Sequence, residues 1–419
     1  MKSQLTIYAA LLLFILTFTQ FNVITFAIDP CLELTDDYNS YKLSNCQPVK
    51  NKRNKRDTYN KRQRQSDIFR IETGVSCKKY CSKIKNIFLK AGRRISKVLT
   101  LNPEEPIYVY VVLKPLDRIK NLASTTPNKF MPLISEDRKT RLYPQALVKQ
   151  FDLEFHSEYA HYDIVSKVNS DINWWWGDGQ IKPNQYDLEL VALHELIHGL
   201  GFKSSWTSKA ESYSYEATGL TPIWYYYDIN WSWKFAGFFE TIFDRQVNFK
   251  NFNRISNFII NNTPTKSYYY VSKLNSTKPF NFTNKLIASK EWKYAKHILA
   301  EATTTHAITF EPLKHTEVKG PFYLETSLKP FIEGVNIINL SKEYKNSADF
   351  LMTYPFIKGS TLDSIVKNGN YESPFGPKTI AILESMGYST PKHPYPTLPT
   401  FTFSYKYLNN KQHFEGWEK

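Results

Sequence analysis

The sequence contains few cysteines and histidines, and after its N-terminus it has no apolar run long enough to cross a bilayer. Its 419 residues include four cysteines and nine histidines. We found no internal repeat, and no later segment predicts a transmembrane helix. With 42% hydrophobic and 16% aromatic residues, the chain is too apolar to be disordered. This length accommodates two domains or one large domain with insertions.

The single strongly apolar segment lies at the N-terminus. A polar start with Lys2 precedes the largely apolar residues 5–18, and Thr25-Phe26-Ala27 follow. This order predicts a secretory signal peptide over residues 1–27. A membrane anchor is the alternative, but the purely apolar stretch is shorter than the roughly 20 residues that a spanning helix needs. We therefore expect a secreted, extracellular protein with no membrane anchor after signal cleavage.

The cysteines and the glycosylation sequons agree with secretion. An even number of cysteines suits an oxidising compartment, and none lies near the histidine motif described below. Structural disulfides are therefore expected, with a zinc-binding pair at Cys77 and Cys81 as the alternative. Asn-x-Ser/Thr sequons predict glycosylated surface loops. The cysteines are Cys31, Cys46, Cys77 and Cys81, and the sequons begin at Asn230, Asn261, Asn275, Asn281 and Asn339.

Acidic residues are scarce beside basic ones, and about half of the net charge of +15 comes from one short run. Residues 50–64 contain eight basic residues and one acid, with three dibasic pairs among Asn and Gln. A nucleic-acid patch is one interpretation, but a signal peptide argues against it. Residues 28–65 are therefore predicted to be a disordered or disulfide-tied basic pro-region, cut by a kexin-type processing protease, or else an inert linker.

The most informative stretch is His194-Glu195-Leu196-Ile197-His198, which lies in an apolar run. Apolar residues recur at intervals of three and four from Tyr186 to Leu200, which predicts a helix. Positions four apart share a helix face, so His194 and His198 can direct a ring nitrogen at one metal ion. Glu195 is rotated off that line, which suits a general base that takes a proton from water instead of binding the metal. Gly199 and Gly201 are expected to end the helix.

A core helix that happens to carry these residues is the alternative interpretation. Two histidines and a glutamate in an apolar helix need partners, because burying unpaired polar groups is costly. The sequence therefore favours a zinc site.

The elements around the motif predict an α+β fold. Residues 71–101 are expected to be largely helical, and residues 107–113, 151–156 and 162–168 are expected to be strands. Residues 378–388 predict a short helix that Gly387 ends and that packs under the motif helix. Strands followed by a helix give α+β order. The boundaries are an N-terminal subdomain (66–202), an insertion without clear helical periodicity (203–330), a C-terminal helical subdomain (331–390) and an extended tail (391–419).

The triplet Trp174-Trp175-Trp176 precedes the motif helix. It could form a glycan- or membrane-facing platform. The favoured interpretation is that these rings form wall and core beside a cleft.

Together these features resemble secreted zinc metallopeptidases of the metzincin-like, leishmanolysin-like kind, including fungal secreted proteins of that build. The resemblance covers about residues 105–390. It rests on the motif and its glycine turn, on an Asp-Arg step at Asp244-Arg245, on a Met-turn at Phe350-Leu351-Met352, and on a closing helix at residues 380–388. It implies a zincin-like catalytic domain with a mixed sheet, in which both helix histidines bind Zn²⁺ and the glutamate is the general base.

The chain departs from this pattern at the third zinc ligand. A catalytic zinc needs three protein ligands plus a water. The compact metzincin position carries Ser204, and residues 334–349 contain no histidine. Other candidates are a glutamate of the insertion, the nearest histidines and oxygen ligands nearer the Met-turn. The histidines are His297, His306, His315 and His393, and the oxygen ligands are Asn339, Glu343 and Asp349.

The sequence thus predicts a secreted zinc-dependent endopeptidase that acts on a protein or peptide substrate and has no nucleic-acid partner. Glu195 is the predicted catalytic residue, and His194 and His198 are the predicted metal ligands. The alternatives are a catalytically inactive, secreted binding or effector glycoprotein on the same fold, and a glycan-binding module built on the tryptophans.

Overall fold

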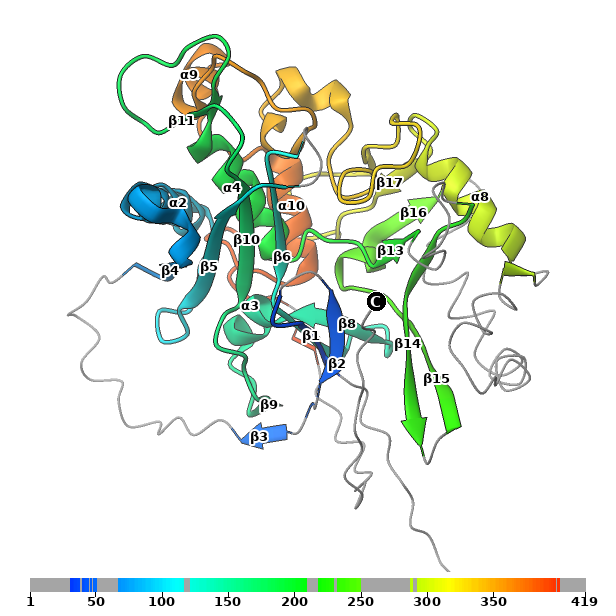
Figure 1. The fold of residues 1–419 in the computed structure, drawn as a ribbon. Helices are drawn as coiled ribbons and strands as arrows, with labels where there is room; N and C mark the ends of the chain where they lie inside the picture. Colours follow the sequence, from blue (N-terminus) through cyan, green and yellow to red (C-terminus); the bar gives the residue numbers. More distant parts are fainter. Residues whose placement is uncertain are drawn as a thin grey trace, which may run out of the picture.

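The protein has an α+β fold, as the sequence predicts, with helices packed on several small sheets (Figure 1). The computed structural model describes residues 31–37, 40–44, 46, 48–50, 67–116, 121–208, 218–229, 232–249, 287–288, 292–396 and 398–399. The expected signal peptide, nearly all of the basic run and the sequons from Asn230 to Asn281 lie outside these residues. No helix in the described part of the chain is long and apolar enough to span a membrane.

A four-stranded sheet supports the motif helix. Its order is β4-β5-β10-β6, in which β10 runs parallel to β5 and antiparallel to β6. Alternate residues of β5 are buried, so one face of this strand faces the core. The strand predicted at 107–113 is confirmed, and the one predicted at 162–168 is confirmed with a two-residue shift at its start. The strands are β4 (Phe69–Thr73), β5 (Ile107–Lys114), β6 (Ala123–Pro127) and β10 (Ile164–Asn169).

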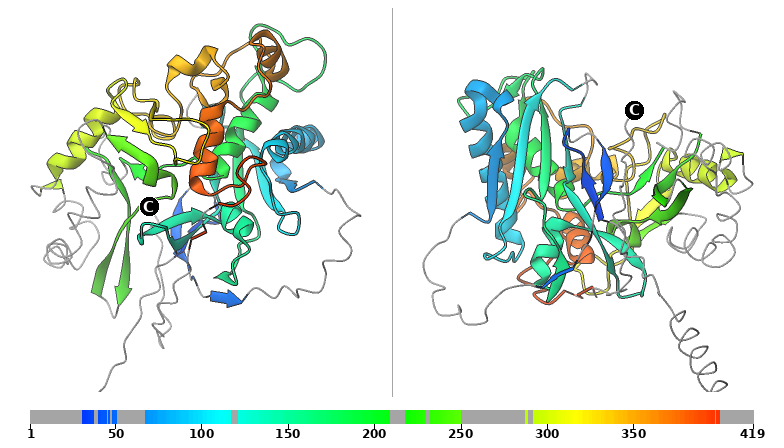
Figure 2. Two further views of the ribbon diagram at one scale, coloured as in Figure 1. Left: turned by 180° about the vertical axis from the view of Figure 1, so that it is seen from behind. Right: turned by 60° about the horizontal axis from the view of Figure 1, so that its bottom comes forward.

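Two helices pack against each other and against this sheet. They are α2 (Cys81–Val98) and the motif helix α4 (Leu188–Gly199). Gly199 lets α4 approach β10, because a Cβ atom there would lie 2.4 Å from Ile164 Cγ2. The C-terminal helix α10 (Pro377–Met386) lies beside α4 (Figure 2), and the Tyr388 hydroxyl donates to the Leu200 carbonyl at 2.8 Å. The helix expected at 378–388 is therefore confirmed over Pro377–Met386, and the residues that follow α10 and α4 contact each other.

A second sheet adds an N-terminal hairpin to the strands that follow β6. Its order is β2-β1-β7-β8, and a separate pair joins β3 to β9. A four-residue helix and a 3₁₀ turn follow β8. These elements are β1 (Cys31–Leu34), β2 (Tyr41–Ser44), β3 (Pro48–Lys50), β7 (Lys129–Ile134), β8 (Thr140–Pro144), α3 (Gln145–Val148), η2 (Lys149–Phe151) and β9 (Phe155–Ser157).

The remaining described elements are further strands, 3₁₀ turns and the helices α8 and α9. Within the residues of the predicted insertion that the structure describes there is one α-helix, α8 (Trp292–Ala302), so the expectation that this region lacks helical periodicity is wrong there. The other elements are β11 (Trp174–Trp175), β12 (Tyr186–Asp187), β13 (Trp206–Thr207), β14 (Thr221–Ile229), β15 (Ser232–Phe239), η4 (Phe243–Gln246), β16 (Val247–Phe249), β17 (Ile308–Phe310), β18 (Phe322–Tyr323), η5 (Lys342–Asn346), η6 (Phe350–Met352) and α9 (Leu362–Asn368).

Two predicted elements are wrong in part. The first residues of the expected helix at 71–101 form β4 and a 3₁₀ segment, η1 (Val75–Tyr80), because β4 pairs in parallel with β5. Most of the expected strand at 151–156 is a turn. Asp152 adopts a left-handed conformation with φ of 50°, which ends η2 and leaves only Phe155 onward to pair with β3.

All four cysteines form disulfides, Cys31–Cys46 and Cys77–Cys81. The zinc-binding alternative at Cys77 and Cys81 is therefore wrong. The sequon at Asn339 is not in a surface loop, because this side chain is 2% exposed and its Nδ2 donates to the Val335 carbonyl at 2.9 Å.

Candidate metal centre

The motif helix begins at an aspartate cap. The Asp187 carboxylate accepts from the Glu189 N–H at 2.9 Å and from the Leu362 N–H at 2.7 Å, so it joins the start of α4 to the start of α9. Such a cap satisfies an otherwise unpaired backbone donor. Glu189 is anchored by Lys90 and Arg94 of α2, each with a nitrogen 2.6 Å from its carboxylate. These contacts fix the helix along its axis.

A glycine turn ends the helix as predicted and also positions a histidine. Gly201 has φ of 115°, its N–H donates to the His198 carbonyl at 3.0 Å, and the Phe202 N–H donates to the Ile197 carbonyl at 3.3 Å. This pair of bonds is the Schellman motif. The turn brings the Phe202 carbonyl back over the helix, where it accepts from His198 Nδ1 at 2.8 Å.

The other histidine is held by a segment far away in sequence. His194 Nδ1 lies 2.7 Å from the carbonyl oxygen of Leu351, in the 3₁₀ turn η6. A carbonyl can only accept, so both Nδ1 atoms carry the proton. Metal-binding histidines typically donate their second ring N–H to a carbonyl or carboxylate in this way. The segment predicted as a Met-turn thus lies against the motif helix, with Met352 fully buried.

The two free ring nitrogens face each other. His194 Nε2 and His198 Nε2 are 3.0 Å apart, and the side chains are 4% and 5% exposed. Burial lowers the pKa of His194 to about 4 and that of His198 well below its usual value, so both rings are neutral at pH 7. Two unprotonated nitrogens cannot hydrogen-bond to each other, and their lone pairs repel. A shared cation would remove this repulsion, so these residues fit a metal ion.

Glu195 lies next to this pair in the helix, and one of its carboxylate oxygens accepts no hydrogen bond from the described residues. It is 5% exposed, and its Oε2 has no hydrogen-bond partner among the described residues. Burial raises its pKa to about 7, while hydrogen bonds from the side chain and backbone of Thr125 in β6 and the charge of Lys203 oppose that shift. A buried carboxylate with an unpartnered oxygen and a pKa near neutrality suits a general base.

Among the residues that the structure describes, no third ligand joins the two histidines. Within these residues, no group of three or more His, Cys, Asp or Glu side chains could hold a metal ion. His297 Nε2 lies 3.1 Å from Glu301, and His306 Nε2 lies 2.9 Å from Glu343. The remaining two histidine candidates, His315 and His393, contact each other, with ring centroids 5.3 Å apart.

The two candidates nearest to the motif and the Met-turn are used elsewhere. Asp349 caps α10 by accepting from the Lys378 N–H at 2.8 Å. The Ser204 hydroxyl donates to Asp244 at 2.6 Å, and that carboxylate is fully buried. The Asp-Arg step seen in the sequence therefore holds the chain after the glycine turn in place.

Trp174 of the tryptophan triplet lies in the core and Trp175 and Trp176 are half-buried, which agrees with the core part of the favoured interpretation. Trp174 is 4% exposed and its Nε1 donates to the Asn169 carbonyl at 2.8 Å. Trp176 stacks on Tyr80 with ring centroids 4.6 Å apart. These contacts leave no flat row of three exposed rings for a glycan.

Three residues at the site were not identified from the sequence. Thr125 contacts Glu195, Lys203 places its charge near Glu195, and the Phe356 ring packs edge-on against His194 with centroids 4.7 Å apart. Each comes from a different element. The site is therefore assembled by tertiary contacts that no local pattern reveals.

Gly201→Ala should weaken metal binding without unfolding the chain. A Cβ atom there would strain the positive φ and lie 2.7 Å from Pro144 Cγ, which shifts the turn that carries the Phe202 carbonyl. Because losing such a carbonyl partner typically costs roughly 10- to 100-fold in affinity, we expect that loss in a zinc titration. Gly320→Ala, also at positive φ but with open space around its Cβ, is the matched control. Equal affinity in both variants would contradict the role of the turn.

Comparisons with known proteins place the chain in a family. A family model described as SPBPB7E8-like matches residues 31–412. The Schizosaccharomyces pombe relative described as "Uncharacterized protein PB7E8.01" is 26% identical over 346 residues, which cover 74% of this chain. The chain spans only 59% of the length of that relative. No solved structure matches.

Proposed function

We propose that this chain, which belongs to the SPBPB7E8-like family, is a secreted zinc-dependent endopeptidase on a zincin-like fold. The observation that carries the proposal is the pair of Nε2 atoms 3.0 Å apart, each on a ring whose Nδ1 donates to a backbone carbonyl. His194 and His198 would hold the metal. Imidazole nitrogens are common zinc ligands, and the carbonyl partners fix the ring tautomer that zinc requires.

Zinc, when bound, would supply a Lewis acid that polarises the scissile carbonyl group. The chain's own contribution is proton transfer by Glu195. This carboxylate takes a proton from the attacking water and returns it to the leaving amine. Burial keeps its pKa at about 7, near the pH at which a base is most effective.

Among the described strands, β6 lies at the edge of its sheet, a position suited to binding an extended peptide. The Asn169 N–H donates to the Leu122 carbonyl and the Asn128 N–H donates to the Asp163 carbonyl, so even-numbered residues of this strand face β10. The backbone groups of Ala123, Thr125 and Pro127 therefore face the other way, where the Thr125 N–H bonds to Glu195 and the Pro127 carbonyl accepts from Tyr41. Peptides commonly bind by adding a strand to such an edge, and Thr125 would place them beside Glu195.

A second candidate is a non-catalytic binding or effector protein on the same fold. It is favoured by the lack, among the described side chains, of a third metal-binding group next to the two histidines. A catalytic zinc site normally has three protein ligands.

The zinc content of the purified, secreted protein separates the two candidates. We expect about one zinc per chain in the wild type by elemental analysis, and loss of that zinc in His194→Ala. His297→Ala is the matched control, because His297 contacts Glu301 on α8 and not the motif helix. A wild type without zinc would favour the binding protein over the peptidase.

A further inference from the structure

The N-terminal hairpin pairs with β7, the strand that follows β6 in the chain and belongs to the second sheet. β1 pairs antiparallel with β7, in the register Leu32 opposite Phe130 and Glu33 opposite Lys129. The Leu34 N–H donates to the Asn128 carbonyl at 2.8 Å, directly after β6. Leu32 is fully buried. This part of the predicted pro-region is thus ordered, and the family model begins with it at residue 31.

β2 brings a tyrosine onto β6 itself. The Tyr41 hydroxyl lies 2.5 Å from Thr126 Oγ1 and donates to the Pro127 carbonyl at 2.5 Å. That carbonyl is one of the groups on the open side of the strand, two residues from Thr125. Burial raises the pKa of Tyr41, so its hydroxyl keeps the proton that it donates. Tyr41 therefore occupies the end of the edge on which an extended peptide would lie.

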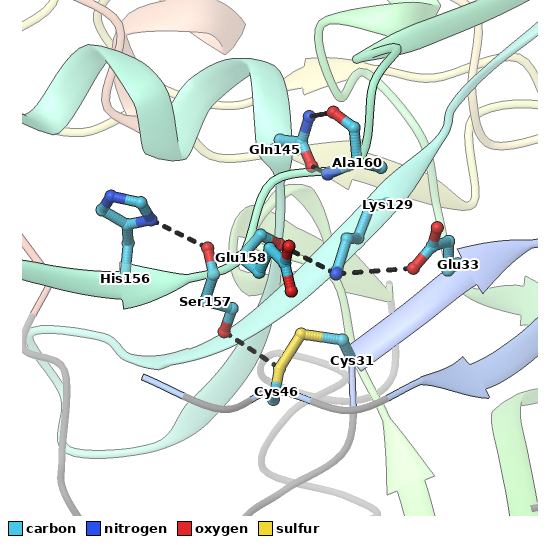
Figure 3. The surroundings of a disulfide bond; sticks show 9 residues. All are labelled: Cys31, Glu33, Cys46, Lys129, Gln145, His156, Ser157, Glu158 and Ala160. Carbon is cyan, nitrogen blue, oxygen red and sulfur yellow. Dashed lines mark hydrogen bonds and ion pairs between the residues drawn. A yellow bond between two sulfur atoms is a disulfide. The ribbon is translucent and has the colours of Figure 1, made fainter. Parts of the chain in front are cut away.

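Polar contacts fix the base of the hairpin to the core (Figure 3). Lys129 Nζ donates to the Glu158 carbonyl at 2.9 Å and pairs with Glu33 at 3.4 Å. The Ser157 hydroxyl donates to Cys46 Sγ of the disulfide at 3.2 Å. β3 then pairs with β9, in the register Val49 opposite His156. The segment is therefore attached at β7, at β9 and at β6.

We propose that residues 31–50 act as an inhibitory segment that blocks one end of the peptide-binding edge. The segment stays bound to the rest of the protein after the chain is cut beyond residue 50. The blocking role rests on the proposed function. The Cys31–Cys46 disulfide lies before the cut and the Cys77–Cys81 disulfide lies after it, so neither joins the two pieces. After a cut, only non-covalent contacts hold residues 31–50 to the rest of the protein. The segment's buried apolar side chains and paired strands supply that attachment. A cut alone therefore leaves the edge blocked, and dissociation of the segment opens it.

The test uses the full chain with a site for a sequence-specific protease placed between residues 50 and 67. After cutting, native gel filtration should show one species, and a non-reducing denaturing gel should show two. Cleavage of fluorescent casein should rise at least tenfold when the segment is removed in mild denaturant. It should fall again when the disulfide-closed synthetic peptide 31–50 is added back.

If the protein unfolds when residues 31–50 are removed, the Tyr41→Phe variant tests the inference without that step. It keeps the ring on Phe130 but removes the hydroxyl that binds β6, so the segment should dissociate roughly tenfold faster. Casein cleavage should rise with it. Tyr395→Phe, at a 93% exposed position, should change neither rate.

A segment that elutes separately straight after the cut would overturn the inference. So would casein cleavage that is the same with and without the segment, in a protein that circular dichroism shows to be folded. If no form binds zinc or cleaves casein, the proposed hydrolysis is wrong. Co-elution of the cut segment then decides separately whether it stays bound, and faster dissociation of the Tyr41→Phe segment shows that its contact with β6 holds it there.

Discussion

Glu195→Gln should abolish peptide hydrolysis and leave the zinc content unchanged. The substitution keeps the size of the side chain and can keep the contact with Thr125, but an amide cannot take a proton from water. General-base catalysis typically contributes about 10²- to 10⁴-fold, so we expect casein cleavage to fall by at least 10²-fold. Glu195 is not one of the two predicted ligands, and its unpartnered Oε2 is the atom that would contact the water.

Glu317→Gln is the matched control for this experiment. Glu317 forms an exposed ion pair with Lys392, whose ammonium lies 2.5 Å away, and exposed pairs contribute little to stability. This control should cleave casein at the wild-type rate. Substantial cleavage by Glu195→Gln would show that another group is the base. Loss of zinc in that variant would instead show that Glu195 helps to bind the metal.

The helix of the candidate site could be predicted from sequence because its signals are local. Apolar spacing gave its extent to within two residues, and Gly201 gave its end. The close pair of His194 and His198 follows from the same geometry, since residues four apart share a face. Every residue of α4 is buried in the structure, and neither this nor the elements that cover the helix were predicted from the sequence.

The partners of these residues could not be predicted, because tertiary contacts supply them. The Leu351 carbonyl that orients His194 lies 157 residues away in the chain. Thr125 reaches Glu195 only because β6 pairs with β10 and both pack on α4. A single sequence contains no signal for such pairings. The same limit explains residues 71–73, whose partner in the sheet is β5, and the N-terminal hairpin, whose partner is β7.

The absence of a third histidine near the motif was visible from sequence, but its structural consequence was not. Ser204 stands where the compact pattern has its third ligand, and the structure gives this serine another role. It is one of three residues that donate to Asp244. This carboxylate thus fixes the segment after the helix through hydrogen bonds from the chain itself. We therefore expect the stability of that segment and metal binding to be separable.

Asp244→Ala should therefore destabilise the fold strongly. The carboxylate is fully buried and accepts from the Ser204 hydroxyl at 2.6 Å, from the Ser205 N–H at 2.9 Å and from the Thr241 N–H at 3.0 Å. Burial raises the pKa of Asp244, and these donors oppose that shift. Removing the acceptor leaves several buried donors unpaired, so we expect a loss of about 3–5 kcal/mol in the free energy of unfolding, measured in urea.

Ser204→Ala is the informative companion, because it removes one donor and keeps the carboxylate. It should cost about 1 kcal/mol, since the other donors remain. Zinc content should be unchanged if the serine is only a partner of Asp244. Loss of zinc in Ser204→Ala with little loss of stability would reverse the assignment and make this serine the missing ligand. Asp363→Ala, which removes a largely exposed partner of Arg94, should leave both properties close to wild type.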